Sequence, residues 1–181
     1  MRQVPEKIIE YLVQFHGSRD WFECHEVLEE YWKERPEEVH GDTLVGLIQV
    51  AVGLYHERRG NRDGAVKMLR SSLSKLEPAA LAELGLDGEL LLTRISDRLR
   101  QLEGADGQKE GTSEFHDLDL PFADAELEAR CRTMAAGRGW TWKRRSAMDD
   151  SELIHRHMRR DRSDVVQARQ ESLQRRRNRH K

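Results

Sequence analysis

The residues best suited to chemistry lie between Asp20 and Trp32, in the segment Asp-Trp-Phe-Glu-Cys-His-Glu-Val-Leu-Glu-Glu-Tyr-Trp. His25, Glu29 and Trp32 are spaced i, i+4 and i+7, which places them on one face of a helix. That face is expected to be buried, because large apolar side chains share it: Trp21, Phe22, Leu28 and Trp32. A histidine and a carboxylate on a buried face need partners, since an unpaired buried charge is costly. The segment therefore predicts where a site lies and leaves its chemistry open.

A second polar pair is predicted on the following helix, where Gln49 and His56 are seven residues apart and share one face. In an antiparallel hairpin this face meets the helix of His25 and Glu29, with His56 about 7.5 Å along the axis from the level of His25. An imidazole and a carboxylate one turn apart can bind a divalent ion, and a second histidine can complete the set. A divalent metal cofactor is therefore predicted on His25, Glu29 and His56, beside a ligand pocket formed by Trp21, Trp32 and Gln49.

Two other interpretations of these residues stay open. His25 and Glu29 are also suited to act as a general base oriented by a carboxylate. Alternatively they form a buried structural hydrogen bond, with Gln49 satisfying the remaining lone pairs and His56 favourably placed at its helix end. The neighbouring Glu26 is expected to point away from His25, toward solvent.

Apolar residues at helical spacing, bounded by capping and breaking residues, predict five helices in the first hundred residues. They span residues 5–16, 20–34, 42–59, 63–76 and 87–102. No strand pattern accompanies them, so the predicted fold class is all-α, a compact helical bundle of about five helices. The third helix is apolar nearly all round, as the buried helix of a bundle is, and its glycines at 46 and 53 predict a close neighbour.

Composition divides the chain into a helical bundle domain over 1–103, a polar, glycine-containing linker over 104–121 and a basic C-terminal extension over 122–181. The extension is expected to contain one short helix near its start. Residues 1–137 hold 17 Lys and Arg against 27 Asp and Glu, a net charge of −10, whereas residues 138–181 hold 14 against 6, a net charge of +8. An acidic body and a basic end indicate parts with different roles. The end of the extension has too few apolar residues for a core, which predicts a solvated helix or disorder.

The basic extension offers a contact for nucleic acid. Aromatic rings can stack on bases while neighbouring cations meet phosphates, and such residues are adjacent here: Trp140, Trp142, Lys143, Arg144 and Arg145. The alternative is that the extension folds back on the acidic body, since the two net charges nearly cancel. Partners are otherwise unassigned, and homo-oligomerisation stays open.

Composition argues against two further classes, membrane-spanning and secreted proteins. No apolar run approaches the roughly 18 residues of a membrane span, and the N-terminus lacks the apolar stretch of a signal peptide. The chain has only two cysteines, Cys24 and Cys131, in dissimilar contexts. Two lone cysteines are typical of a reducing compartment, so a cytoplasmic location is expected.

The segment from Phe15 to Gly64 resembles the uncharacterised bacterial and archaeal family called domain of unknown function 309. The resemblance covers roughly residues 8–102 and rests on an ordered set of positions: Phe15, Gly17, Trp21, Phe22, His25, Glu26, Glu29, Trp32, Gly46, Leu47, Ile48, Gln49, His56, Gly60, Asn61, Gly64 and Ala65. It implies a compact all-helical domain whose His-x-x-x-Glu-x-x-Trp motif is His25, Glu29 and Trp32, for which metal binding has been suggested. No established activity comes with the resemblance.

Three functions therefore remain in competition. The first is an uncharacterised helical domain that binds a divalent metal or small ligand at its polar cluster. The second is a non-enzymatic interaction module in which the histidine and glutamate only stabilise the fold. The third is a nucleic-acid-associated protein acting through its basic extension. Whether the protein is an enzyme is left open by the sequence.

Overall fold

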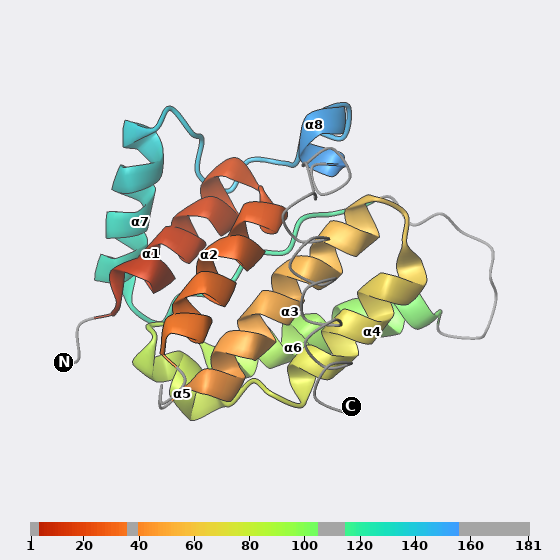
Figure 1. The fold of residues 1–181 in the computed structure, drawn as a ribbon, viewed down its shortest axis with the longest axis horizontal. Coiled ribbons are helices and arrows are strands. Elements are labelled where there is room, and N and C mark those ends of the chain that lie inside the picture. The colour runs from red at the N-terminus through yellow and green to blue at the C-terminus, as the bar shows by residue number, and fades with distance from the viewer. Residues whose placement is uncertain (1–3, 36–39, 105–114, 156–181) are drawn as a thin grey trace, which may run out of the picture.

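The computed structural model describes residues 4–35, 40–104 and 115–155, and within these ranges the protein is all-α, as predicted (Figure 1). The described chain forms eight α-helices and one π-helical turn, and no strand; six of the helices have seven or more residues. The elements are α1 (Glu6–Val13), η1 (Gln14–Ser18), α2 (Trp21–Glu34), α3 (Gly41–Arg58), α4 (Arg62–Leu73), α5 (Pro78–Glu83), α6 (Gly88–Glu103), α7 (Ala125–Gly137) and α8 (Ser151–Ile154). None of these helices is both long and apolar enough to span a membrane.

Short polar side chains start the helices where the sequence predicts. The carboxylate of Asp20 accepts a hydrogen bond from the backbone N–H of Glu23 at 3.1 Å and begins α2. Asn61 and Asp87 cap α4 and α6 in the same way. Such caps satisfy N–H groups that have no partner inside their own helix. The predicted second, third, fourth and fifth helices are thus present, with bounds shifted by one to three residues.

The first predicted helix changes type partway. α1 ends at Val13, and the next five residues form the π-helical turn η1, closed by a hydrogen bond from Arg19 N–H to the Gln14 carbonyl at 3.1 Å. Arg19 then adopts the left-handed conformation with φ 59°. π-turns and left-handed non-glycine residues are uncommon, and both concentrate at functional sites. This turn brings His16 and Arg19 into the interior.

α3 is the central helix and packs between α2 and α4 (Figure 1). Gly46 and Gly53 allow α4 and the residues just after it to approach closely. A Cβ atom on Gly46 would lie 2.7 Å from the Leu76 side chain, and one on Gly53 would lie 2.8 Å from the Leu69 side chain. The predicted packing reason for these glycines is therefore confirmed.

Replacing Gly53 by valine is expected to lower the free energy of unfolding by about 2 kcal/mol, because overfilling a packed core costs about 1–3 kcal/mol. Urea unfolding measures this change. Gly60, where an added Cβ meets nothing within 4 Å, is not a suitable control because its φ is 75°. Gly137, which is equally open and has no positive φ, is the matched control; its valine variant should unfold within about 1 kcal/mol of the wild type.

The segment 115–155 packs against the helical bundle over its length. Leu118 and Leu120 are buried, and α7 lies against α1 (Figure 1). Phe122 forms an isolated antiparallel bridge with Leu86. Residues 115–121 of the predicted linker thus contribute to the core, while 105–114 and the end of the extension, 156–181, lie outside the described residues. The three-part division remains a prediction, and the described part of the extension is folded onto the bundle.

Two buried arginines fasten this segment. Arg19 donates to the Arg144 carbonyl at 2.9 Å, to the Leu118 carbonyl at 3.4 Å and to the Asp119 carboxylate at 2.7 Å. Arg58 donates to the Leu153 carbonyl at 3.2 Å and to the Ser146 hydroxyl at 3.3 Å. Both arginines are less than 5% exposed, and both lie in or beside the N-terminal helices. They connect parts of the chain about 100 residues apart.

Candidate metal centre

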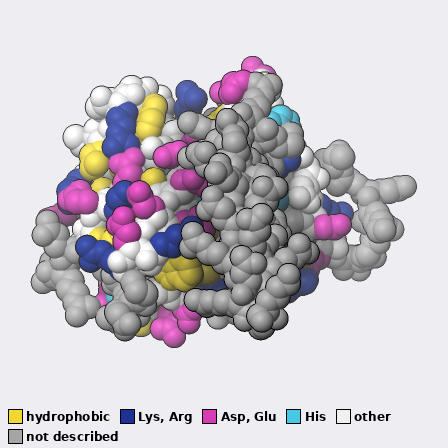
Figure 2. All heavy atoms as spheres, in the orientation of Figure 1, with side chains coloured by type: hydrophobic (Ala, Val, Ile, Leu, Met, Phe, Trp, Pro, Cys, Tyr) yellow, Lys and Arg dark blue, Asp and Glu magenta, His cyan; other side chains and the backbone are white. Residues whose placement is uncertain are grey.

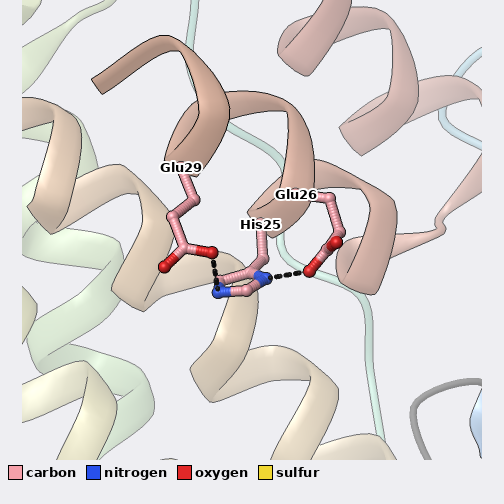
Figure 3. A group of neighbouring side chains, drawn as sticks. All are labelled: His25, Glu26 and Glu29. Atoms are coloured by element: carbon pink, nitrogen blue, oxygen red, sulfur yellow. Dashed lines mark hydrogen bonds and ion pairs between the residues drawn. The ribbon is translucent and has the colours of Figure 1, made fainter. Parts of the chain in front are cut away.

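One histidine and two carboxylates gather on α2 (Figure 3). The ring of His25 lies between them: its Nδ1 is 3.1 Å from Oε1 of Glu26, and its Nε2 is 3.6 Å from Oε2 of Glu29. Potential ligand atoms of the three residues lie within 4.8 Å of one another. All three belong to a single stretch of helix, so their relative positions are fixed by the local backbone of α2.

The two contacts of the His25 ring differ in kind. The 3.1 Å contact to Glu26 is a hydrogen bond, which requires the proton to be on Nδ1. In the neutral ring this leaves the lone pair of Nε2 directed at the Glu29 carboxylate, 3.6 Å away. Two lone pairs facing each other repel unless a cation lies between them. A cation between the two atoms would remove this repulsion.

The structure corrects the predicted burial of this helix face. The side chains of His25, Glu26 and Glu29 are 27%, 33% and 36% exposed, so the group lies at the surface. Glu26 was expected to point away from His25, and this is wrong, because its carboxylate bonds the histidine ring. A half-exposed ion pair contributes only about 0–1 kcal/mol to stability. Fold stability alone gives little reason for the arrangement.

The three residues predicted to line a ligand pocket lie in different surroundings. Trp21 is fully buried and contacts Phe15 and Phe115 at ring-centroid distances of 6.0 and 5.6 Å. Trp32 is 37% exposed, which corrects the expectation that it lies in the core. Gln49 is half-buried on α3, and its amide oxygen has no hydrogen-bond partner in the structure. The pocket formed by these residues remains a prediction.

His56, the third predicted metal ligand, is not part of the group around His25. Among the described residues, the ligand atoms that come together belong to His25, Glu26 and Glu29. His56 Nδ1 instead lies 3.0 Å from the side-chain amide nitrogen of Asn61, the residue that caps α4. Partial burial, and secondarily Arg59, lowers the pKa of His56. Its role as a ligand stays a prediction.

A lysine adjoins the group at the next turn of α2. Lys33 Nζ lies 3.0 Å from Oε1 of Glu29, the oxygen that does not face His25. One Glu29 oxygen is thereby engaged by a cation, and the other remains directed at the histidine. On the face shown in Figure 2, Lys and Arg side chains are interspersed with acidic ones toward the left of the view.

The predicted nucleic-acid contacts are placed in two environments. Trp142 stacks near His16, with ring centroids 4.8 Å apart, and its indole N–H is 3.4 Å from Glu128. Trp140 packs on Gly17, where an added Cβ would lie 3.0 Å from its ring. Lys143 bonds Glu128 at 2.7 Å, while Arg144 and Arg145 are exposed. Nucleic-acid binding by these residues remains a prediction.

Sequence reasoning missed His16 and Arg19. A histidine at the end of the first predicted helix would ordinarily be exposed, but His16 is fully buried, and its ring bonds the Leu12 carbonyl at 2.9 Å and the Leu120 N–H at 3.0 Å. Arg19 was assigned no role. The available signal was the run Phe115 to Phe122, in which apolar and charged residues alternate as in a half-buried extended segment. Such a segment requires partners on the bundle.

The fold and this group together define an all-α protein with a half-exposed histidine–carboxylate cluster on one helix. Residues 8–68 match the sequence profile of the domain of unknown function DUF309. The chain is 41% identical over 174 residues to the uncharacterized protein YpuF of Bacillus subtilis (strain 168), covering 95% of this chain and 96% of that one. The chain belongs to the DUF309 family. No solved structure matches it.

The similarity to YpuF extends well beyond the family segment. Because 95% of the chain aligns, most of residues 115–155 has a counterpart in that relative. The segment that packs on the bundle is thus shared by two proteins rather than being an addition to this one.

Proposed function

We propose that the protein binds a divalent transition-metal ion through Nε2 of His25 and a carboxylate oxygen of Glu29. The observation that carries the proposal is the 3.6 Å approach of these two atoms on one helix, with the opposite ring nitrogen 3.1 Å from the Glu26 carboxylate. Mixed imidazole and carboxylate ligation suits zinc, manganese and iron(II) better than calcium or magnesium.

The distance between the acceptors fits this assignment. Zinc–nitrogen and zinc–oxygen bonds of about 2.1 Å, opened to the tetrahedral angle, separate the two ligand atoms by about 3.4 Å. The observed separation is 3.6 Å, so a small side-chain adjustment suffices. A metal ion would replace the repulsion between two lone pairs with two favourable bonds.

Glu26 is assigned a supporting role in this proposal. Histidine ligands usually donate their second N–H to a carboxylate, which fixes the tautomer and orients the ring. Glu26 accepts that hydrogen bond at 3.1 Å. Lys33 would hold the other Glu29 oxygen, leaving a single oxygen for the metal.

Two protein ligands leave several coordination positions for water or a substrate. The half exposure of all three side chains gives an incoming ligand access to these positions. A metal-bound water or a polarised carbonyl is the chemistry that such an open position supplies. Metal-assisted hydrolysis is the reaction class we propose to test first.

Zinc, manganese or cobalt is expected to raise the melting temperature of protein purified and then treated with chelator. A metal concentration 100-fold above Kd adds about 2.7 kcal/mol, or about 5 °C or more for a chain of this length. The His25→Ala variant should lose this rise, and Glu26→Gln should bind about 10–100-fold more weakly. Thermal unfolding and isothermal titration calorimetry measure both effects.

His56→Ala is the matched control, because it removes a predicted ligand that lies outside the group. It should keep wild-type metal affinity. Loss of binding in His56→Ala with retention in Glu26→Gln would favour the originally predicted set of His25, Glu29 and His56. No stabilisation by any of the three ions, with unchanged stability of His25→Ala, would contradict metal binding and favour the interaction module.

Location and partners stay at the level of proposals. Both cysteines, Cys24 and Cys131, are unpaired and buried, which supports a reducing, cytoplasmic setting. Nucleic-acid binding is the weaker of the alternatives, because Trp142 is engaged with His16 rather than presented as a stacking platform.

A further inference from the structure

A second candidate site is a cavity whose lining does not include His25, Glu26 or Glu29. It has a volume of about 250 Å³ and lies where the segment 115–119 and the segment 143–148 meet Arg19. Its lining is unusually rich in charged groups for so small a space, and includes Arg19, Asp117, Asp119 and Arg145. Ligand pockets are mostly apolar with a few polar groups, so a cavity of this polarity fits a small, polar ligand.

The lining holds three cations, Arg19, Lys143 and Arg145, and two carboxylates, Asp117 and Asp119. Asp119 is paired with Arg19 at 2.7 Å, and Asp117 accepts hydrogen bonds from the backbone and hydroxyl of Ser146. Lys143, also at the cavity, is paired with Glu128. Arg145 makes no ion pair with any residue in the described ranges, so its charge is the one without a local counterpart.

A second, buried cation lies behind the wall. Arg58 is 4% exposed and bonds Ser146, which lines the cavity; its hydrogen-bond acceptors are two carbonyl oxygens and a hydroxyl rather than a carboxylate. Burial lowers the pKa of Arg58 to about 10, although the charge of the nearby Asp117 acts in the opposite direction. The Ser146 hydroxyl lies between Asp117 and Arg58 and is bonded to both.

Behind the same wall, two N–H groups have no acceptor among the described residues. They are the indole N–H of Trp21 and the Nε–H of Arg58, and both are buried. The two side chains stack, with the guanidinium carbon 4.5 Å from the indole ring centroid, and Trp21 contacts the cavity residue Phe115 at 5.6 Å. Unpaired buried donors are rare and costly, and they add positive potential on this side of the cavity.

The backbone is also unusual here. The left-handed non-glycine residues of the described chain are Arg19, with φ 59°, and Lys143, with φ 55°, and both line this cavity. Such conformations are strained, and they concentrate at ligand clamps. The π-turn η1 leads directly into the first of them.

We propose that this cavity binds a small oxyanion, such as phosphate or the phosphoryl group of a small metabolite. Arg145 supplies the free charge at the cavity, while Arg58 and the unpaired N–H groups behind the wall supply positive potential. Both lining carboxylates face Arg19, Asp119 at 2.7 Å and Asp117 at 3.9 Å, and the Arg19 charge offsets part of theirs. The site is separate from His25 and does not depend on a metal ion there.

Inorganic phosphate and pyrophosphate are the probes for the full-length protein, with sodium chloride at matched ionic strength as reference. Either probe at 100 times its Kd is expected to raise the melting temperature by about 5 °C or more over the reference. Arg145→Gln should weaken binding by at least about tenfold in calorimetric titration, since a hydrogen bond to a charged group is lost. Its side chain is exposed, so the variant is expected to fold.

Arg144→Gln is the matched control, because Arg144 is the exposed neighbour and does not line the cavity. Its affinity should stay within about twofold of the wild type. A phosphate effect no larger than that of sodium chloride, or equal losses in the two variants, overturns the proposal. A single-stranded oligonucleotide that binds far more tightly than pyrophosphate and is weakened equally by both variants would also overturn it, in favour of a nucleic-acid surface.

Discussion

Replacing Arg19 by alanine is expected to lower the free energy of unfolding by about 3–5 kcal/mol. The side chain is almost fully buried and ties its own turn to three points on the segment 115–155: the Arg144 carbonyl, the Leu118 carbonyl and the Asp119 carboxylate. Removing the guanidinium leaves Asp119 and two carbonyls without their donor. Breaking a buried charged network by deleting one member is among the most destabilising single changes.

Urea unfolding followed by circular dichroism measures this loss. Arg19→Lys keeps the charge but not the planar set of donors, so it should recover only part of the stability. Arg70→Ala removes an exposed arginine whose partner, Glu103, is also exposed, and it should change stability by less than about 1 kcal/mol. If Arg19→Ala unfolds like Arg70→Ala, the segment 115–155 is not fastened by this residue.

The Arg19 variant also tests whether the bundle and the segment 115–155 are one folding unit. The segment buries Leu118, Leu120 and Cys131 against the bundle, and its backbone supplies acceptors to both interior arginines. Loss of Arg19 should therefore shift one cooperative transition rather than separate two. A new early transition in Arg19→Ala, with the bundle unchanged, would show that the segment unfolds on its own.

Local rules predicted most of the helical architecture. Capping by Asp20 depends on residues three positions apart, and the packing role of Gly53 follows from its place in an apolar helix. Such signals are short-range, and the sequence displays them directly. The π-turn after Val13 was not predicted, because it depends on how His16 and Arg19 are satisfied by residues about 100 positions away.

The sequence predicted where the candidate metal centre lies but not all the residues that form it. The spacing of His25 and Glu29 fixes their common face, and the structure places them 3.6 Å apart. The direction of the Glu26 side chain was wrongly predicted, because the position of a residue around the helix fixes only the direction of its Cβ. The glutamate side chain is long enough for its carboxylate to reach the adjacent His25 ring. The burial of Trp32 was wrongly predicted because Trp32 lies near the end of α2. An apolar pattern shows which face of a helix is buried, but it does not show how far along the helix its neighbours extend.

The role of the segment after residue 115 escaped prediction for a physical reason. The few apolar residues that this segment adds to the core are separated by charged residues, so its composition resembles that of a solvated linker. Those charges are paired in the fold: Asp117 with Ser146 and Asp119 with Arg19. A polar composition therefore does not distinguish an exposed linker from an extended segment whose polar groups have interior partners.

Lowering the pH from 7 to 5 is expected to reduce the free energy of unfolding by about 2 kcal/mol through His16 alone. Burial lowers the pKa of His16 from 6.5 to about 4, so the folded protein keeps the ring neutral where the unfolded chain is protonated. The unfolded state then binds more protons, and stability rises with pH across this window. The stability that depends on the neutral His16 ring is fully present above about pH 6.5 and is lost as the pH falls toward 4.

The neutral ring is required by its contacts. Nδ1 donates to the Leu12 carbonyl, and Nε2 accepts the N–H of Leu120, which a protonated ring cannot do. Trp142 and Phe122 enclose the ring at 4.8 and 5.3 Å. Burial is the largest cause of the lowered pKa of His16; the Leu12 carbonyl and Asp119 favour the charged ring, and Arg19 and Lys143 oppose it. Acid should therefore loosen the junction between η1 and the segment that begins at 115.

Urea titrations at pH 7 and pH 5 of the wild type and of His16→Gln measure this contribution. The variant should be less stable at pH 7 but lose about 2 kcal/mol less than the wild type on acidification, because its amide takes up no proton. His40→Gln is the control, since His40 pairs with the exposed Glu83 and lies away from this junction. It should retain the wild-type pH dependence; equal slopes for His16→Gln and the wild type would mean that the buried ring is not the acid-sensitive group.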